Sequence, residues 1–178
     1  MKRTSKVALG GVVSSLSLLF MFLTGVIPFA TYALPAISGA LLIIIVVEYN
    51  YKWAYLVYIS VSILSVFISP EKDAAAFFIA FFGHYPITKC LLEKIKNRFV
   101  EYMLKFLTFN ACVISAFTII VFIFRMNEIL SDLGTIGIYG LIIALVLINI
   151  VFIIYDIALS RVISAYIHWF RPNFLRKI

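Results

Sequence analysis

The stretch from Ile136 to Ser160 reads IGIYGLIIALVLINIVFIIYDIALS and contains one charged residue, Asp156. A helix of about 20 apolar residues is long enough to cross the hydrocarbon core of a bilayer, which is about 30 Å thick. A transmembrane β-strand needs only about 9–11 residues and alternates strictly between apolar and polar positions. The stretch is therefore predicted to be a membrane-spanning helix.

Five further apolar runs precede this stretch, and together they predict an all-α membrane protein with six transmembrane helices. The chain has 178 residues, of which 64% are hydrophobic and 13% are charged. Soluble domains carry about 45–50% apolar and about 25% charged residues, so we expect lipid to cover much of this surface. We expect a single membrane domain over residues 1–178, although the second run is short for a span. The helices are predicted at 7–24, 33–47, 53–69, 74–92, 104–124 and 136–160.

The basic residues predict how these helices are oriented. If the N-terminus is cytoplasmic, thirteen of the 15 Lys and Arg residues fall on the cytoplasmic side, and only Lys72 and Arg125 fall outside. Cytoplasmic loops are enriched in Lys and Arg, so both the N- and C-termini are predicted to be cytoplasmic. The net charge of +7 has the same explanation, together with contacts to anionic membrane lipid. No nucleic-acid partner is expected.

The segment Cys90–Phe106, between the fourth and fifth runs, is the only extended polar segment on the predicted cytoplasmic side. Its apolar residues recur at helical spacing, with Lys94, Lys96, Arg98 and Glu101 among them. This pattern predicts an amphipathic helix that lies along the membrane interface, with its basic side chains reaching the lipid headgroups. The alternative is a surface that binds a protein partner.

His84 is the polar residue in the fourth run that most invites a functional interpretation, because polar groups are costly at membrane depth. Pro86 follows it and has no N–H to donate to the carbonyl of Phe82, so a kink is expected there. We interpret His84 either as a packed, hydrogen-bonded residue or as a group that faces a ligand.

Three other polar residues in the apolar runs have structural explanations. Asp156 lies near the basic inner edge and is expected to pair with Lys89 or Arg161. Asn110 and Asn149 are expected to join helices through interhelical hydrogen bonds. None of them is predicted to be catalytic.

Signatures of enzymes and of metal sites are missing from the sequence. Cys90 and Cys112 have no CxxC spacing and are interpreted as small packing residues. His84 and Cys90 are six positions apart, so a Cys–His couple between them would need a break in the helix. We therefore predict no enzyme activity, no metal site and no cofactor. There is no P-loop either, so any dependence on ATP would come from a partner.

The first run contains two neighbouring faces of small residues. Ala8, Gly11 and Ser15 fall at i, i+3 and i+7, and Gly10 with Ser14 forms an adjacent pair. Small residues let another helix approach closely, because lipid supplies no hydrophobic force for helix association. The faces therefore serve either internal packing or the docking of another membrane protein.

In its layout the chain resembles the substrate-binding S components of energy-coupling factor (ECF) transporters. The resemblance rests on six short helices, a basic N-terminus, small residues on the first helix and an aromatic, proline-containing first outer loop. The most similar stretch, KVALGGVVSSLSLLFMFLTGVIPF, covers residues 6–29. S components typically carry AxxxA on the first helix. Here Ala8 is followed by Val12, and Gly11 with Ser15 is the nearer equivalent.

The resemblance implies a bacterial plasma-membrane protein that binds a small water-soluble micronutrient, a vitamin or its precursor, near the outer face. It also implies partners, namely a transmembrane T component and two ATPase subunits, which would dock at Ala8, Gly11 and Ser15. Aromatic walls with a few polar anchors suit a flat, soluble ring, although aromatic packing is the alternative for each residue. The implied substrate-binding residues are Phe29, Tyr32, Phe77, Phe81, His84, Arg125, Asn127 and Tyr139.

A non-transporting scaffold is the alternative from another functional class. The cell-shape protein MreD has a similarly small six-helix layout. This interpretation predicts that cytoplasmic partners bind to Cys90–Phe106 and that no ligand pocket exists.

Overall fold

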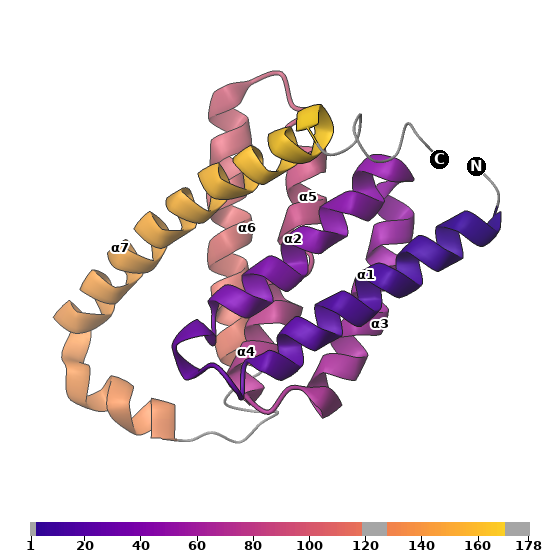
Figure 1. The fold of residues 1–178 in the computed structure, drawn as a ribbon. Coiled ribbons are helices and arrows are strands. Elements are labelled where there is room, and N and C mark those ends of the chain that lie inside the picture. The colour runs from indigo at the N-terminus through magenta and orange to yellow at the C-terminus, as the bar shows by residue number, and fades with distance from the viewer. Residues whose placement is uncertain (1–2, 119–127, 170–178) are drawn as a thin grey trace. The chain divides into compact units, whose positions relative to one another are not determined.

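The computed structural model describes residues 3–118 and 128–169, which form helices joined by short turns, without a strand among them. The chain comprises two units, Met1–Ala116 and Phe117–Ile178, and each is described by itself. Figure 1 shows the helices with their labels. The elements are α1 (Arg3–Leu23), the 3₁₀ turn η1 (Pro28–Ala30), α2 (Ala33–Glu48), α3 (Tyr51–Ile68), α4 (Lys72–Phe77), the π-helical turn η2 (Phe78–Phe82), α5 (Tyr85–Leu92), α6 (Arg98–Thr118) and α7 (Glu128–Ala165).

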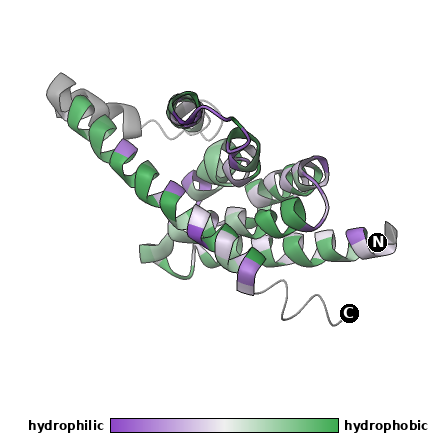
Figure 2. Ribbon diagram, turned by 90° about the horizontal axis from the view of Figure 1, so that it is seen from above, coloured by the Kyte–Doolittle hydropathy of each residue, from purple (hydrophilic) through white to green (hydrophobic). Residues whose placement is uncertain are grey.

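Within the described residues, five helical segments are long and apolar enough to cross a membrane, as judged by length and composition. Hydrophobic residues occupy most of their length in Figure 2. α2 has 16 residues and is about 24 Å long at about 1.5 Å per residue, which is less than the bilayer core. The all-α prediction is confirmed for the described residues, while the sixth crossing, through α2, stays a prediction. The five segments are Thr4–Leu23, Tyr51–Ile68, Lys72–Leu92, Arg98–Ala116 and Ile142–Trp169.

The predicted helix boundaries differ from the observed ones where polar residues flank an apolar run. α6 begins at Arg98 rather than at residue 104, and α7, with 38 residues, extends beyond 136–160 at both ends. Arg, Lys and Glu are good helix formers, so charged residues at the end of an apolar run do not end the helix. The predicted end of the fifth span at 124 lies outside the described residues.

The separate interfacial helix predicted over Cys90–Phe106 is not confirmed, because the segment divides at a turn. α5 ends at Leu92, and the side-chain oxygen of Asn97 then accepts the backbone N–H of Phe99 at 3.0 Å. Asn at such a position caps the start of a helix, and from here α6 continues to Thr118. The apolar residues of Cys90–Phe106 keep helical spacing on both sides of the turn. The spacing alone therefore could not predict that one helix ends and another begins within this segment.

α2 packs against α1, α3, η2 and α5 in the centre of the first unit. The Ser17 hydroxyl donates to the Ser38 carbonyl at 3.2 Å, and the Ser38 hydroxyl donates to the Ser17 carbonyl at 3.1 Å. Reciprocal bonds of this kind join helices in a medium that supplies little hydrophobic driving force. The core around them consists of Val13, Met21, Leu42, Ile45, Ala54, Val57, Val61, Ala75, Phe78 and Ile87.

The connections of the first unit alternate between its two ends. At one end, Trp53 at the start of α3 donates its indole N–H to the carbonyl of Lys6 at 3.3 Å. At the other end, the Thr24 and Ser69 hydroxyls lie 3.4 Å apart, and a Cβ on Gly25 would come within 2.6 Å of Pro70. The first two outer connections predicted from the charges therefore meet at the same end.

Candidate functional site

The segment Lys72–Leu92, which contains the fourth predicted run, is a broken helix, interrupted just before the proline that was expected to bend it. The N–H of Gly83 donates to the carbonyl of Phe78 at 2.8 Å, five residues back, which is the π-helical bond. Pro86 lies in the first turn of α5, where a missing N–H costs little. π-Helical turns often accompany functional sites, so this break is the candidate site.

Two side chains, one from α3 and one from the broken segment itself, bond the backbone carbonyls at the break. The Tyr58 hydroxyl of α3 donates to the carbonyl of Ile79 at 2.5 Å, and the His84 Nε2–H donates to the carbonyl of Ala80 at 2.7 Å. Gly83 permits this arrangement, because a Cβ there would lie 2.6 Å from the Tyr58 ring. Unbonded backbone groups cost several kcal/mol in lipid, so these bonds stabilise the break.

His84 is the centre of a polar cluster that joins α3, α5 and α6. The Tyr55 hydroxyl lies 2.9 Å from Thr88 Oγ1, and Thr88 Oγ1 donates to the His84 carbonyl at 3.1 Å. On the other side, Cys112 Sγ of α6 lies 3.2 Å from His84 Nε2. A carbonyl only accepts hydrogen bonds, so the bond to Ala80 assigns the proton to Nε2 and leaves Nδ1 without a proton, 3.5 Å from Thr88 Oγ1.

Phe81 forms the aromatic wall beside this cluster. Its ring centroid lies 4.8 Å from that of Tyr85 and 5.1 Å from that of Phe109, and the side chain is 5% exposed. The Tyr58 ring meets the His84 ring edge-on at 6.2 Å. Aromatic rings from α6 (Phe109) and α3 (Tyr58) therefore pack against the broken segment.

Phe77 and Tyr32 meet at the end of the unit that was predicted to face outward. Their ring centroids lie 5.3 Å apart in an edge-to-face arrangement, and the Tyr32 hydroxyl donates to Asp73 Oδ2 at 3.4 Å. Partial burial, followed by the nearby Asp73 carboxylate, raises the pKa of Tyr32 above its ordinary value. Phe29, in the same loop as Tyr32, is 94% exposed.

The structure thus places the implied substrate-binding residues in two groups. Phe81 and His84 lie at the break, whereas Tyr32 and Phe77 lie at the end of the unit with exposed Phe29 near them in sequence. The π-helical turn lies between Phe77 and His84 and changes the helical phase that the i, i+4 and i+7 spacing assumed. Arg125 and Asn127 lie outside the described residues, as does the side chain of Tyr139.

Four residues of the polar cluster were not predicted as site residues: Tyr55, Tyr58, Thr88 and Cys112. Tyr and Thr are common on apolar helices, and their positions in the sequence give no sign of a shared partner. Tyr55 and Tyr58 fall at i and i+3 on one face of α3, which is the only signal that pairs them. Among the described residues, no group of three or more His, Cys, Asp or Glu side chains could hold a metal ion.

A network of ion pairs lies at the C-terminal end of α5, away from the break. Lys89 is fully buried and pairs with Glu93 at 3.0 Å, while Lys105 of α6 reaches Glu93 at 3.4 Å and Glu101 at 2.8 Å. Glu93, one turn along the same helix, is a partner of Lys89 that was not predicted from the sequence. The expected pairing of Asp156 with Lys89 or Arg161 stays a prediction. This network joins α5 to α6 across the turn.

The two small-residue faces of α1 have different surroundings. Gly10 is buried, and a Cβ on it would lie 3.4 Å from Val57 of α3. Ala8, Gly11 and Ser15 are exposed, and a Cβ on Gly11 would meet nothing within 4 Å. Internal packing therefore uses the Gly10 face and leaves the other face uncovered in the first unit.

No protein-family model matches the chain, and searches of the curated proteins and of the solved structures find no match. The class of protein follows from the architecture: an all-helical chain, in its described residues, with several helices long and apolar enough for a multi-pass membrane protein. The polar break in the segment Lys72–Leu92 is the feature of this architecture that a function has to explain.

Proposed function

We propose that the chain is the substrate-binding membrane subunit of an uptake system for a small water-soluble micronutrient, located in a plasma membrane. The observation that carries the proposal is the broken helix with the His84 cluster in its interruption. Transporters commonly bind substrates where a membrane helix is discontinuous, since backbone and side-chain polar groups then become available at membrane depth.

The chemistry at the break suits a small ring-shaped molecule. Hydroxyl, imidazole and thiol groups are present within one cluster, and aromatic side chains such as Phe81 lie beside them. Pockets for small molecules commonly combine apolar walls with a few oriented polar groups. In this proposal the break contributes Phe81 and His84. The outer end of the first unit contributes Phe29, Tyr32 and Phe77. Arg125, Asn127 and Tyr139 are candidates from the resemblance alone.

Energy for uptake would come from partners, in the manner of the ECF transporters that the chain resembles. The exposed face of Ala8, Gly11 and Ser15 supports this part of the proposal, because a second membrane helix can approach small residues closely. The partner would be a transmembrane T component that carries two ATPase subunits. The chain itself would not be an enzyme.

A thermal-shift screen of the purified full-length chain against water-soluble vitamins tests the proposal. At about 100 times its Kd a ligand contributes about 2.7 kcal/mol, so we expect one compound to raise Tm by about 5–10 °C. His84→Gln should reduce this shift, while Ser60→Ala, on an exposed part of α3, should not. If no compound stabilises the protein and no ATPase module copurifies with it, the proposal is wrong.

The scaffold of MreD-like layout remains the second candidate, and one observation favours it. Lys94, Lys96 and Arg98 are exposed around the turn that precedes α6, where a cytoplasmic protein has access to them. Affinity purification separates the two functions, because a scaffold copurifies with a cytoplasmic partner through this turn and binds no vitamin.

A further inference from the structure

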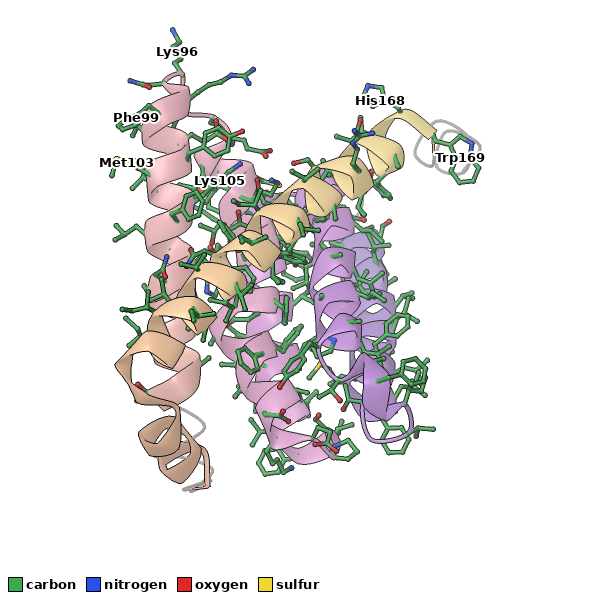
Figure 3. All side chains as sticks on the ribbon, turned by 90° about the vertical axis from the view of Figure 1, so that its left-hand side faces the viewer. Lys96, Phe99, Met103, Lys105, His168 and Trp169 are labelled. Atoms are coloured by element: carbon green, nitrogen blue, oxygen red, sulfur yellow. The ribbon has the colours of Figure 1, made fainter. Side chains whose placement is uncertain are left out.

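The turn before α6 presents positive charge at one end of the first unit. Lys94, Lys96 and Arg98 are all exposed. They lie at the N-terminal end of α6, where the helix dipole adds further positive potential. Figure 3 shows Lys96 at the extreme end of this unit, beyond the last turn of helix. The surface is therefore favourable for an anionic group.

The acidic residues nearby do not neutralise these three cations. Glu93 and Glu101 form their ion pairs with Lys89 and Lys105, whose side chains are at most 4% exposed. Within the part of the chain that the structure describes, Lys94, Lys96 and Arg98 take part in no ion pair. The carboxylates of Glu93 and Glu101 are thus paired within the protein, and the exposed side chains of Lys94, Lys96 and Arg98 keep their positive charge.

An apolar groove follows directly from the basic turn along α6. Figure 3 shows Phe99 and Met103 projecting from one side of α6 and Lys105 from the other. From Phe99 to Asn110 the groove extends about 16 Å at about 1.5 Å per residue, which is about half of the hydrocarbon core. Its length therefore equals the depth of one leaflet. The groove is lined by Phe99, Tyr102, Met103, Phe106, Leu107 and Asn110.

We propose that this surface binds an anionic phospholipid, with the phosphate at Lys94, Lys96 and Arg98 and one acyl chain in the groove of α6. Unpaired basic residues at a membrane surface attract anionic headgroups. Phe99 and Met103 are 72% and 59% exposed, and an acyl chain covers such side chains without leaving a polar group unbonded. This inference depends on the membrane location of α6 and not on the proposed uptake function.

Native mass spectrometry of the purified full-length chain tests the headgroup contact, with phosphatidylglycerol and phosphatidylcholine as the two probes. The wild type should retain more phosphatidylglycerol than phosphatidylcholine. K96Q/R98Q should weaken this binding about 30-fold, the change that corresponds to about 1 kcal/mol for each charge. The matched control K52Q/R161Q removes the same charge from two other exposed positions and should bind as the wild type does. Equal retention of the two lipids by the wild type would overturn the proposal.

A photo-crosslinking residue in place of Met103 tests the acyl-chain contact in membranes that contain phosphatidylglycerol. We expect an adduct whose added mass is that of one phospholipid, and we expect K96Q/R98Q to reduce its yield. Crosslinks to a peptide instead, either α7 of this chain or another protein, would show that a helix covers the groove and would refute lipid binding there.

Discussion

At the scale of single residues, the broken helix depends on how one carbonyl is accommodated. The carbonyl of Phe82 lacks its usual helical partner, because the residue four positions later is Pro86. α2 approaches this oxygen at Gly39, where a Cβ would overlap it. Close Cα–H to carbonyl contacts of this kind are weakly favourable between packed helices. Gly39 therefore determines how closely α2 lies against the candidate site.

Gly39→Ala should destabilise the protein by about 1–3 kcal/mol, because the added methyl group meets rigid backbone rather than a movable side chain. Gly11→Ala is the matched control, since its methyl group meets open space and Ala is the better helix former by about 1 kcal/mol. Unfolding of both variants in detergent micelles, followed by circular dichroism, measures the difference. Equal stability of the two variants would contradict the close approach.

The sequence predicted part of the site at this scale. His84 and the break before Pro86 could be predicted, because a polar residue in an apolar run and a proline are both local signals. Tyr58 and Cys112 could not, because each comes from another helix and reaches His84 or its neighbours only after the helices have packed. Their residue types are ordinary for a membrane helix, so nothing local marks them.

At the scale of elements, the junction of α5 and α6 depends on a small set of buried charges. Lys105 makes most of the contacts described for this set, because its ammonium contacts Glu93 and Glu101 and lies 5.5 Å from the centre of the Tyr102 ring. Removing one member of a buried pair costs more than the pair contributes, because the remaining charge loses its partner. The network thus fixes α6 relative to the end of α5.

Lys105→Met should destabilise the protein by about 1–3 kcal/mol. Removing one partner of a fully buried pair costs about 3–5 kcal/mol of stability. The cost is smaller here because Glu93 is 37% exposed and water can solvate its charge. Lys94→Met, at an exposed position in the adjacent turn, should change the stability by no more than about 0.5 kcal/mol. Thermal unfolding of the two purified variants checks this, and a Lys94 effect as large as that of Lys105 would refute the assigned role.

At the scale of the whole molecule, the charge distribution predicts which end of the bundle faces the cytoplasm. In the first unit, Lys6, Lys52 and Lys96 belong to the end that contains the α2–α3 and α5–α6 turns. Lys72 lies at the other end, where it donates to the carbonyls of Val66 and Ser69 at the end of α3. Lys72 is a basic residue on the predicted outer side, where the positive-inside rule expects few. Its charge stabilises the C-terminus of α3, so its position is compatible with the predicted orientation.

Labelling of intact cells with a membrane-impermeant maleimide tests the orientation. In a Cys90→Ala background, Glu71→Cys should react from outside, because it lies in the second outer turn. Lys52→Cys and Lys96→Cys should react only after the membrane is permeabilised. Cys112 is 6% exposed and should remain unlabelled. The opposite pattern of labelling would reverse the predicted topology.

The sequence alone determined the helical class and the approximate positions of the helices, because apolar runs longer than about 17 residues leave few alternatives in a bilayer. It also located the interruption at Pro86. Only the tertiary structure decided that Asn97 divides Cys90–Phe106 into two helix ends and that the Gly10 face of α1 packs inward. Hydropathy and spacing describe each helix separately, whereas caps, charge networks and helix contacts depend on which residues of other helices lie nearby.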